Sequence, residues 1–452
     1  MVRNSRQRQG LKRRSRPRIR ASRLVRRARL QYTLSAVRKR KRAHARGQSR
    51  APVAAPRLWQ RFLIVPLMII VQGLRSGLVW LRDVVLPTAP RILAVDPAQF
   101  LIVGHRGACA SAVENTLASC EHAVEIEGAD AVEIDLCVTK DRQVVVWHDW
   151  DPDALVALAR QAGAELDVLC RPVVPSAGHP MRRPVCDLTL AELRAHYGYA
   201  IVGQNQTVPA RLPVLEEVVR WARTKPRLKA VVLDCKVPPA RKELITVVAE
   251  ALRREVEREP VGVPFVFLTP YAEVLEVMQT VVPAAVRSCD VEIPVGFFPD
   301  RSQLSAVARA RASGNGWASI GRPLFTIGGW WTYRKTIQAD LERMREARGA
   351  TPPVPPVYYV CWTINQTREM RHLMRMGVSG ILTDFPALLR RLLNRKLRQD
   401  TRRAARSARK QVRRKRREAK RRAHIAGLQT QEFARKSTRH QLPTNQNSRS
   451  PR

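Results

Sequence analysis

The chain has 452 residues and a formal net charge of +43, from 81 Lys and Arg residues against 38 Asp and Glu residues. The charge is segregated, because residues 1–61 hold 22 basic residues and no acid, and residues 390–452 hold 23 basic residues and three acids. These tails are too poor in large apolar residues to build cores of their own, which excludes them as folded enzyme domains and leaves the nearly neutral residues 62–389.

The N-terminal tail, residues 1–61, is predicted to be disordered. Three interpretations fit it and the C-terminal tail: solvated disorder without a dedicated partner, adhesion to an anionic membrane surface, or adhesion to nucleic acid. Neither tail has the interleaved aromatic residues that would indicate base stacking. The segment that follows the first tail favours the membrane.

Residues 62–98 are an anchor candidate and linker. Within them, residues 62–81 are apolar for ten residues and are then interrupted by Gln72 and Arg75. A membrane span needs about 20 mostly apolar residues, so Arg75 makes a spanning helix marginal, and an interfacial or re-entrant anchor fits better. A soluble helix packed beneath the central domain is the third alternative. We expect a membrane-associated protein, held peripherally or by a single anchor, with a soluble cytoplasmic protein as the alternative.

Titratable residues follow two runs that are typical of buried strands. The run 101–103 leads into His105 and Arg106, and the run 144–146 leads into His148. Buried strands do not carry such groups without a reason, because burying them unpaired costs free energy. Two histidines can transfer protons, and an arginine can bind a phosphate.

A pair of acids, Glu133 and Asp135, lies inside a third strand-like run, residues 131–136. Side chains alternate across a strand, so both carboxylates project on one face. Two acids on one face repel each other unless a cation joins them, which indicates a metal site. An exposed strand with a polar outer face is the alternative.

A third acid, Asp234, ends the apolar run 230–235 and shares a face with Lys236. Asp234 can complete a carboxylate cage while Lys236 meets a phosphate oxygen, or the two can form a buried ion pair. Together with the histidines, these residues describe a phosphoryl-ester hydrolase.

The ordered motifs between residues 101 and 389 resemble those of the glycerophosphodiester phosphodiesterase family. The motifs are His105-Arg106-Gly107, Glu114-Asn115-Thr116, Gly128-Ala129-Asp130, Glu133-x-Asp135, Thr139-Lys140-Asp141, His148-Asp149, Asp234-x-Lys236, Trp362-Thr363-x-Asn365 and Thr383-Asp384-Phe385-Pro386. So many motifs in the family's order make the resemblance specific.

The resemblance implies an α/β fold, a TIM (β/α)8 barrel of the phospholipase C-like phosphodiesterase type, over residues 99–389. The strand count agrees, with helical stretches expected at 215–224, 242–257, 272–281, 337–347 and 370–376. Eight candidate strands lie near 101–104, 131–136, 230–235, 264–268, 285–291, 317–321, 357–362 and 379–383. The leftover residues 144–148 are predicted to form an added strand that folds His148 back over the barrel mouth.

The resemblance also implies the reaction, which is metal-dependent hydrolysis of a glycerophosphodiester to glycerol 3-phosphate and an alcohol. His105 and His148 would be the general acid/base pair, and Arg106 and Lys236 would bind the phosphate. Glu133, Asp135 and Asp234 would hold the divalent cation. An all-carboxylate site selects a hard ion, so Mg²⁺ or Ca²⁺ is expected rather than zinc.

Three departures from the family pattern concern the substrate and the cation. Asp234 stands where the family usually has Glu, and Val113 stands where it usually has Pro. Residues 150–185 replace an Arg-Thr-Thr-x-Gly-like loop that covers the barrel mouth in relatives. His179 lies in this stretch, and a lone loop histidine is more often a surface residue than a catalyst.

Other functions remain open beside glycerophosphodiester hydrolysis. Lysophospholipase D activity on lysophospholipids is one alternative, and the anchor candidate favours it. Phosphoinositide-specific phospholipase C and sphingomyelinase D use related two-histidine chemistry on other lipids. A non-catalytic barrel that binds membrane or nucleic acid is the alternative of another class, and intact His105 and His148 count against it.

The eight cysteines form no C-x-x-C pair, so the pattern predicts no zinc site. Several lie in strands, where free cysteine behaves as a small hydrophobe, which favours a reducing compartment for the catalytic domain. Cys170 and Cys186 are the one pair considered for a disulfide. In the C-terminal tail, residues 390–425 lack Gly and Pro, so residues 390–452 are expected to be a basic helical or disordered tail.

Overall fold

The computed structural model describes residues 99–165, 167–204, 206–259, 261–291, 305–322, 329–347 and 354–439. The basic tail at 1–61 and the anchor candidate at 62–98 lie outside these residues, and the expectations for them stay predictions. No helix of the described ranges is long and apolar enough to cross a membrane.

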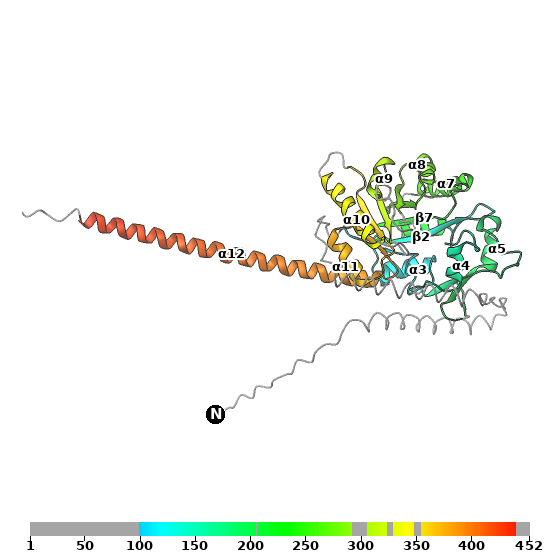
Figure 1. Ribbon diagram of the computed structural model, residues 1–452, viewed down its shortest axis with the longest axis horizontal. Coiled ribbons are helices and arrows are strands. Elements are labelled where there is room, and N and C mark those ends of the chain that lie inside the picture. Colours follow the sequence, from blue (N-terminus) through cyan, green and yellow to red (C-terminus); the bar gives the residue numbers. More distant parts are fainter. Residues whose placement is uncertain are drawn as a thin grey trace, which may run out of the picture. The chain divides into compact units, whose positions relative to one another are not determined.

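Eight parallel strands close into the expected TIM barrel (Figure 1). Closure comes from the first strand, which pairs with the last strand on one side and with the second on the other. The strands are β1 (Leu101–Gly104), β2 (Ala131–Val138), β7 (Ala230–Cys235), β8 (Phe265–Thr269), β9 (Val286–Val291), β10 (Trp317–Gly321), β11 (Tyr358–Trp362) and β12 (Gly380–Thr383). The eight predicted strands are confirmed, and β2 runs two residues further than expected.

Alternation along each strand separates the barrel interior from the layer beneath the helices. On β2, Ile134 and Leu136 are fully buried in the outer apolar cluster, and Ala131 belongs to the inner one. Burying a side chain of this size contributes about 1.5–3 kcal/mol. Glu133 and Asp135 share the face opposite Ile134, as the alternation predicts.

Helices surround the barrel because their apolar stripes pack on the outer strand faces (Figure 1). Two helices begin earlier than expected, at Gly329 and Thr367, and the one at 306–312 was not predicted. The surrounding helices are α6 (Leu215–Arg223), α7 (Lys242–Arg258), α8 (Ala272–Val281), α9 (Ala306–Ala312), α10 (Gly329–Glu346) and α11 (Thr367–Met376).

An added strand, β3 (Val144–Val146), pairs antiparallel with β2 beyond the barrel. It confirms the interpretation of residues 144–148 as an extra strand. Val144 lies opposite Val138 and Val146 opposite Leu136, so the chain runs back from the carboxyl end of β2 toward Asp135. His148 follows two residues later.

Residues 150–185, which replace the loop found in relatives, form part of a small folded insertion. Trp147, Tyr197 and Tyr199 supply its own apolar cluster, and the ring centroid of Trp147 lies 6.0 Å from that of Tyr197 and 5.2 Å from that of Tyr199. This apolar cluster stabilises short helices and strands that the sequence pattern alone does not predict. They are α4 (Leu155–Gln161), β4 (Cys170–Val173), η3 (Val185–Asp187), α5 (Leu190–His196), β5 (Gly198–Ile201) and β6 (Thr207–Val208). His179 is exposed, as expected.

None of the eight cysteines, all of which lie in the described residues, forms a disulfide, and the pair considered for one, Cys170 and Cys186, is not bridged. Seven of them are buried, in keeping with cysteine as a small apolar side chain.

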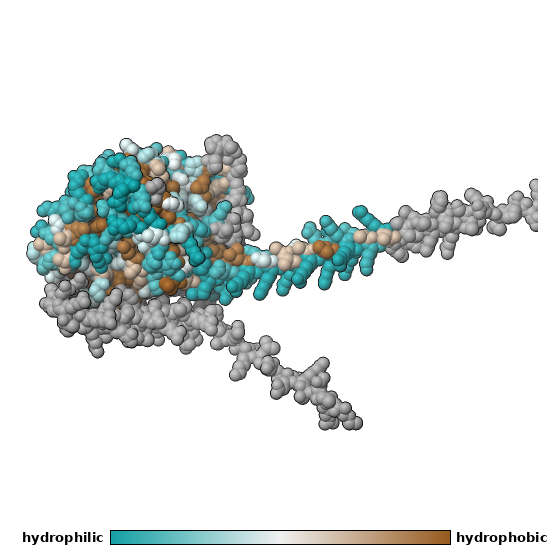
Figure 2. All heavy atoms as spheres, turned by 180° about the vertical axis from the view of Figure 1, so that it is seen from behind, coloured by the Kyte–Doolittle hydropathy of each residue, from teal (hydrophilic) through white to brown (hydrophobic). Residues whose placement is uncertain are grey.

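The chain divides into two compact units, residues 1–392 and residues 393–452. The helix α12 (Pro386–Arg439) accounts for the described part of the second unit. Its residues 401–423 are all exposed and include 13 Lys and Arg but one acid. Hydrophilic colour dominates this length of the helix in Figure 2. A helix that is polar all round has no apolar stripe with which to join a core.

Candidate active site

The turn after β1 places the first histidine. Arg106 and Gly107 both have positive φ angles, 50° and 81°. A Cβ at Gly107 would lie 2.5 Å from Ser119 Oγ and 2.6 Å from the Ser119 carbonyl carbon, so only glycine fits here. This tight turn brings His105 to the carboxyl end of the barrel.

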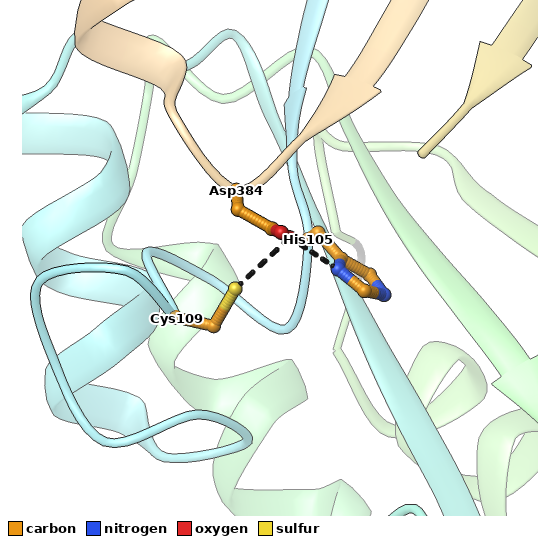
Figure 3. A group of neighbouring side chains, drawn as sticks. All are labelled: His105, Cys109 and Asp384. Carbon is orange, nitrogen blue, oxygen red and sulfur yellow. Dashed lines mark hydrogen bonds and ion pairs between the residues drawn. The ribbon is translucent and has the colours of Figure 1, made fainter. Parts of the chain in front are cut away.

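His105 contacts a carboxylate that lies 279 residues later in the chain. Its Nδ1 lies 2.6 Å from Oδ1 of Asp384, which follows β12. Asn365 donates to Asp384 Oδ2 at 2.5 Å, and the Cys109 thiol donates to Oδ1 at 3.1 Å. Figure 3 shows the Asp384 side chain reaching both His105 and Cys109. The parallel neighbours β1 and β12 make this contact possible.

Two effects compete on His105. Burial and the positive charge of Arg106 lower its pKa, but the charge and hydrogen bond of Asp384, with the charge of Glu133, outweigh them. The pKa of His105 is raised above its ordinary value of 6.5.

His148 has a similar partner and the opposite shift. Its Nδ1 lies 2.7 Å from Asp149 Oδ1, and the same oxygen accepts a 2.7 Å hydrogen bond from Arg160. Burial, followed by the charges of Arg160 and Arg106, lowers the pKa of His148 to about 4. At neutral pH this imidazole is therefore uncharged.

Glu133, Asp135 and Asp234 each offer a carboxylate oxygen within 4.8 Å of the other two. Asp234 reaches the group although it is one methylene shorter than the Glu expected there. Oε1 of Glu133 is buried without a hydrogen-bond partner. Burial, with the charge of Asp135, raises the pKa of Glu133 to about 8. A buried carboxylate oxygen without a hydrogen-bond partner, in a cluster of three acids where the pKa of Glu133 is raised, is the arrangement expected of a site for a hard divalent cation.

Lys236 lies among these acids. Its Nζ is 2.6 Å from Asp234 Oδ2 and 3.1 Å from Asp135 Oδ1. The ion pair that the sequence left as one alternative is therefore formed. The side chain keeps 24% of its surface exposed, and the residue lines the cavity that contains the histidines.

Arg106 belongs to a buried network of arginines and acids. Its guanidinium lies 3.0 Å from Glu114, 3.1 Å from Glu165 and 3.3 Å from Asp135. Arg160 of α4 contacts Glu114 and Glu165 as well as the carboxylate that holds His148. The insertion is thus tied to the barrel by charge.

Sequence reasoning missed Arg160 and Glu165. Neither belongs to a family motif, and both lie in the stretch that departs from the family pattern. The one available signal was an arginine on the largely apolar helix 155–161. Asp384 was recognised only as part of a motif, without its contact to His105.

One cavity of about 1010 Å³ collects the predicted residues. Six of the seven line it, and the seventh, Asp135, is 1% exposed beside Lys236. The six are His105, Arg106, Glu133, His148, Asp234 and Lys236. Leu155, Val156 and Tyr271 also line the cavity, and they are 77%, 61% and 43% exposed. The cavity therefore has a charged floor and an apolar rim.

Comparisons with known proteins agree with this site. Residues 105–258 match the model of the glycerophosphoryl diester phosphodiesterase family. A human lysophospholipase D, GDPD1, is 26% identical over 313 residues, which cover 65% of this chain and 85% of the relative. A glycerophosphodiester phosphodiesterase from Caldanaerobacter subterraneus is 45% identical over 49 residues, 11% of this chain and 20% of its own.

A phosphodiesterase from Oleispira antarctica has been solved in complex with the product sn-glycerol-3-phosphate. It is 18% identical, with a TM-score of 0.44 over 66% of this chain and 99% of the solved one.

Proposed function

We propose that the chain belongs to the glycerophosphodiester phosphodiesterase family, whose members are phosphoric diester hydrolases, and that it cleaves glycerophosphodiesters to glycerol 3-phosphate and an alcohol. The observation that carries this proposal is the single cavity described above. It joins two histidines of opposite pKa shift to three clustered carboxylates and a lysine. Hydrolysis of a phosphodiester needs a base, an acid and positive charge near the phosphoryl oxygens, and this set supplies each.

The two histidines divide the proton transfers. His148 is neutral at pH 7 and can accept the proton of the attacking nucleophile. His105 keeps its proton to higher pH and can donate it to the leaving alkoxide. Asp384 and Asp149 fix the ring orientations through Nδ1, which leaves Nε2 of each ring for the substrate.

Glu133, Asp135 and Asp234 would hold the divalent cation, with Mg²⁺ or Ca²⁺ as the ions that suit an all-oxygen site. The bound ion would neutralise charge that develops on the phosphoryl oxygens. Because Glu133 holds a proton up to a pH of about 8, cation binding should release a proton and strengthen as the pH rises.

Lys236 and Arg106 would face the phosphate. Lys236 combines a position on the cavity wall with a partly exposed side chain. Arg106 is 4% exposed and already surrounded by acids, so its main effect is a fixed positive charge beside the site.

A lysophospholipid is the second candidate substrate. The exposed side chains of Leu155, Val156 and Tyr271 give the cavity an apolar rim that a soluble headgroup does not need. An acyl chain could lie against that rim while the phosphodiester reaches the histidines. The human relative named as a lysophospholipase D supports the same substrate class.

Association with anionic membranes is the proposed location. The N-terminal tail carries a charge of +22 and the C-terminal tail +20, and each basic residue near such a surface is attracted by about 1 kcal/mol. Residues 62–81 would add a salt-resistant apolar contact. Nucleic acid remains the competing partner, which co-sedimentation with anionic vesicles and with duplex nucleic acid at matched salt would separate.

The test of function is product analysis with the full chain. Glycerophosphocholine and lysophosphatidylcholine should each yield free choline, with glycerol 3-phosphate or lysophosphatidic acid as the other product. Chelator should stop both reactions, and Mg²⁺ or Ca²⁺ should restore them. Release of phosphocholine would contradict the bond assignment, and equal rates with and without chelator after exhaustive dialysis would contradict the metal. No turnover of any phosphodiester would favour a non-catalytic barrel.

A further inference from the structure

A second group of metal-ligating side chains adjoins the carboxylate site but differs from it in chemistry. His105, Cys109 and Asp384 each offer one donor atom, and the three atoms lie within 4.8 Å of one another. Figure 3 shows that the Cys109 and His105 side chains converge on Asp384 from two sides. The donors are a ring nitrogen, a thiol sulfur and a carboxylate oxygen.

The three donors point at a common position. Oδ1 of Asp384 is 2.6 Å from His105 Nδ1 and 3.1 Å from Cys109 Sγ. The other carboxylate oxygen is held separately by Asn365. The Asp384 side chain is thus fixed with one oxygen facing both potential ligands, and small side-chain movements would admit an ion with bond lengths of about 2.0–2.3 Å.

We propose that His105, Cys109 and Asp384 bind Zn²⁺, and that this binding inhibits the enzyme. The set mixes nitrogen, sulfur and oxygen, the ligand types that zinc prefers and Mg²⁺ and Ca²⁺ avoid. The absence of C-x-x-C pairs had predicted no zinc site. The proposal departs from that prediction, because the fold brings together Cys109 and Asp384, which are 275 residues apart in the chain.

Charge and protons balance on binding. The thiol and Nδ1 of the protonated imidazole each release a proton to solvent, and the imidazole then coordinates through the freed Nδ1 lone pair with its remaining proton on Nε2. The thiolate and the carboxylate then offset the two positive charges of the ion. A buried site without net charge avoids the desolvation penalty that an unpaired ion would meet.

Zn²⁺ can reach the three ligands through the substrate cavity. His105 and Asp384 both line that cavity, and the His105 side chain is 17% exposed. Cys109 is fully buried and closes the inner side. Soft ions that enter the cavity therefore meet the histidine and carboxylate first and the thiol last.

Inhibition follows from the position of His105. An ion at Nδ1 takes the place of the Nδ1 proton and of its hydrogen bond to Asp384, so the proton left on Nε2 belongs to a neutral imidazole and is a much weaker acid than that of the imidazolium. The binding of zinc stands independently, but the inhibition rests on the proposed function. Saturating Mg²⁺ at the three carboxylates should not relieve it, since the two ions use different ligands.

The first experiment measures inhibition of the full chain by buffered Zn²⁺ at saturating Mg²⁺. Cys109→Ser keeps a hydroxyl that can donate to Asp384 but removes the soft ligand. The concentration of Zn²⁺ for half inhibition should rise by at least about 10-fold in this variant, with each protein normalised to its own zinc-free rate. Cys186→Ser, which alters the one cysteine that is not buried, should behave like the wild type. Equal inhibition of wild type and Cys109→Ser would overturn the proposal.

The second experiment needs no activity. Co²⁺ added to the Mg²⁺-loaded chain should give the near-ultraviolet absorption of a thiolate–cobalt bond, and Cys109→Ser and His105→Ala should each lose or weaken it. Absence of the band in the wild type, or its persistence in Cys109→Ser, would refute the site. A band in a chain that hydrolyses no phosphodiester would keep the metal site and reject the proposed function.

Discussion

The two histidine clusters of the active site share a design and differ in outcome. Each ring is hydrogen-bonded through Nδ1 to an aspartate, at 2.6 Å for His105 and 2.7 Å for His148. The pKa of His105 is raised, whereas that of His148 falls to about 4. An aspartate partner alone therefore does not decide the charge of a histidine.

The opposite pKa shifts of the two histidines come from the other hydrogen-bond partners of their aspartates. Asp384 is further bonded by neutral groups, the amide of Asn365 and the thiol of Cys109. Asp149 instead shares its oxygen with the buried guanidinium of Arg160. That cation neutralises the carboxylate and repels a second positive charge on His148. One site thus holds a charged and an uncharged imidazole at the same pH, which is what paired acid and base catalysis requires.

Replacing either histidine should have the largest effect. His105→Ala and His148→Ala should each lower kcat by about 10² to 10⁴ on glycerophosphocholine, because each removes one proton transfer. Calorimetric titration should find cation affinity nearly unchanged, since neither ring belongs to the carboxylate cluster.

A substrate with a good leaving group separates the two roles. The p-nitrophenyl ester of glycerol 3-phosphate releases an anion that needs no proton. His105→Ala should therefore recover much of its rate on this ester, and His148→Ala should not. The reverse pattern would exchange the acid and the base.

Replacing Arg160 should reduce the difference in pKa between His148 and His105. Arg160→Met leaves Asp149 without its guanidinium partner and Glu114 and Glu165 with Arg106 alone. A broken buried pair typically costs about 3–5 kcal/mol in the free energy of unfolding. The pKa of His148 should rise, so the acidic limb of the pH–rate profile should move to higher pH. Urea denaturation and the rate profile measure the two effects.

The matched control is Arg253→Met, which breaks an exposed pair with Glu257. It should change stability by less than about 1 kcal/mol. If Arg160→Met is no less stable than this control, the buried network does not hold the insertion to the barrel.

The carboxylate cluster interacts with both histidines through charge, but its replacement should act mainly on the cation. Glu133→Gln keeps the shape but loses a charged ligand, so the Mg²⁺ or Ca²⁺ concentration for half-maximal rate should rise about 10-fold or more. Glu216→Gln, an exposed carboxylate on α6, should leave that concentration unchanged. An unshifted cation requirement in Glu133→Gln would place the ion elsewhere.

Asp384→Asn should give the smallest change and sharpen the comparison most. The amide oxygen can still accept from His105, but the negative charge that raises its pKa is gone. His105 then loses its proton at lower pH, so the alkaline limb of kcat/KM should move toward acid while the acidic limb stays. Movement of the acidic limb instead would assign the wrong histidine to it.

The barrel could be read from the sequence because its signals are local. Apolar runs and their charged ends located all eight strands, and alternation placed Glu133 and Asp135 on one face. Convergence of the strand ends then gathered six of the seven predicted residues in one cavity.

The insertion could not be read in the same way. Its core comes from residues such as Trp147 and Tyr199, whose contacts depend on the finished fold. Arg160 and Glu165 act through partners far along the chain, so no spacing reveals them. The same reason hid the group of His105, Cys109 and Asp384.

Nuclear magnetic resonance titration of the histidine rings in the metal-free chain tests the central difference most directly. Spectra of His105→Ala and His148→Ala assign the two signals by their loss. The His148 ring should stay neutral at pH 6 and gain its second proton only near pH 4. The His105 ring should still be mostly protonated at pH 6.5, because its pKa is raised above that ordinary value. Two rings that titrate together would contradict the assignment of His148 as base and His105 as acid.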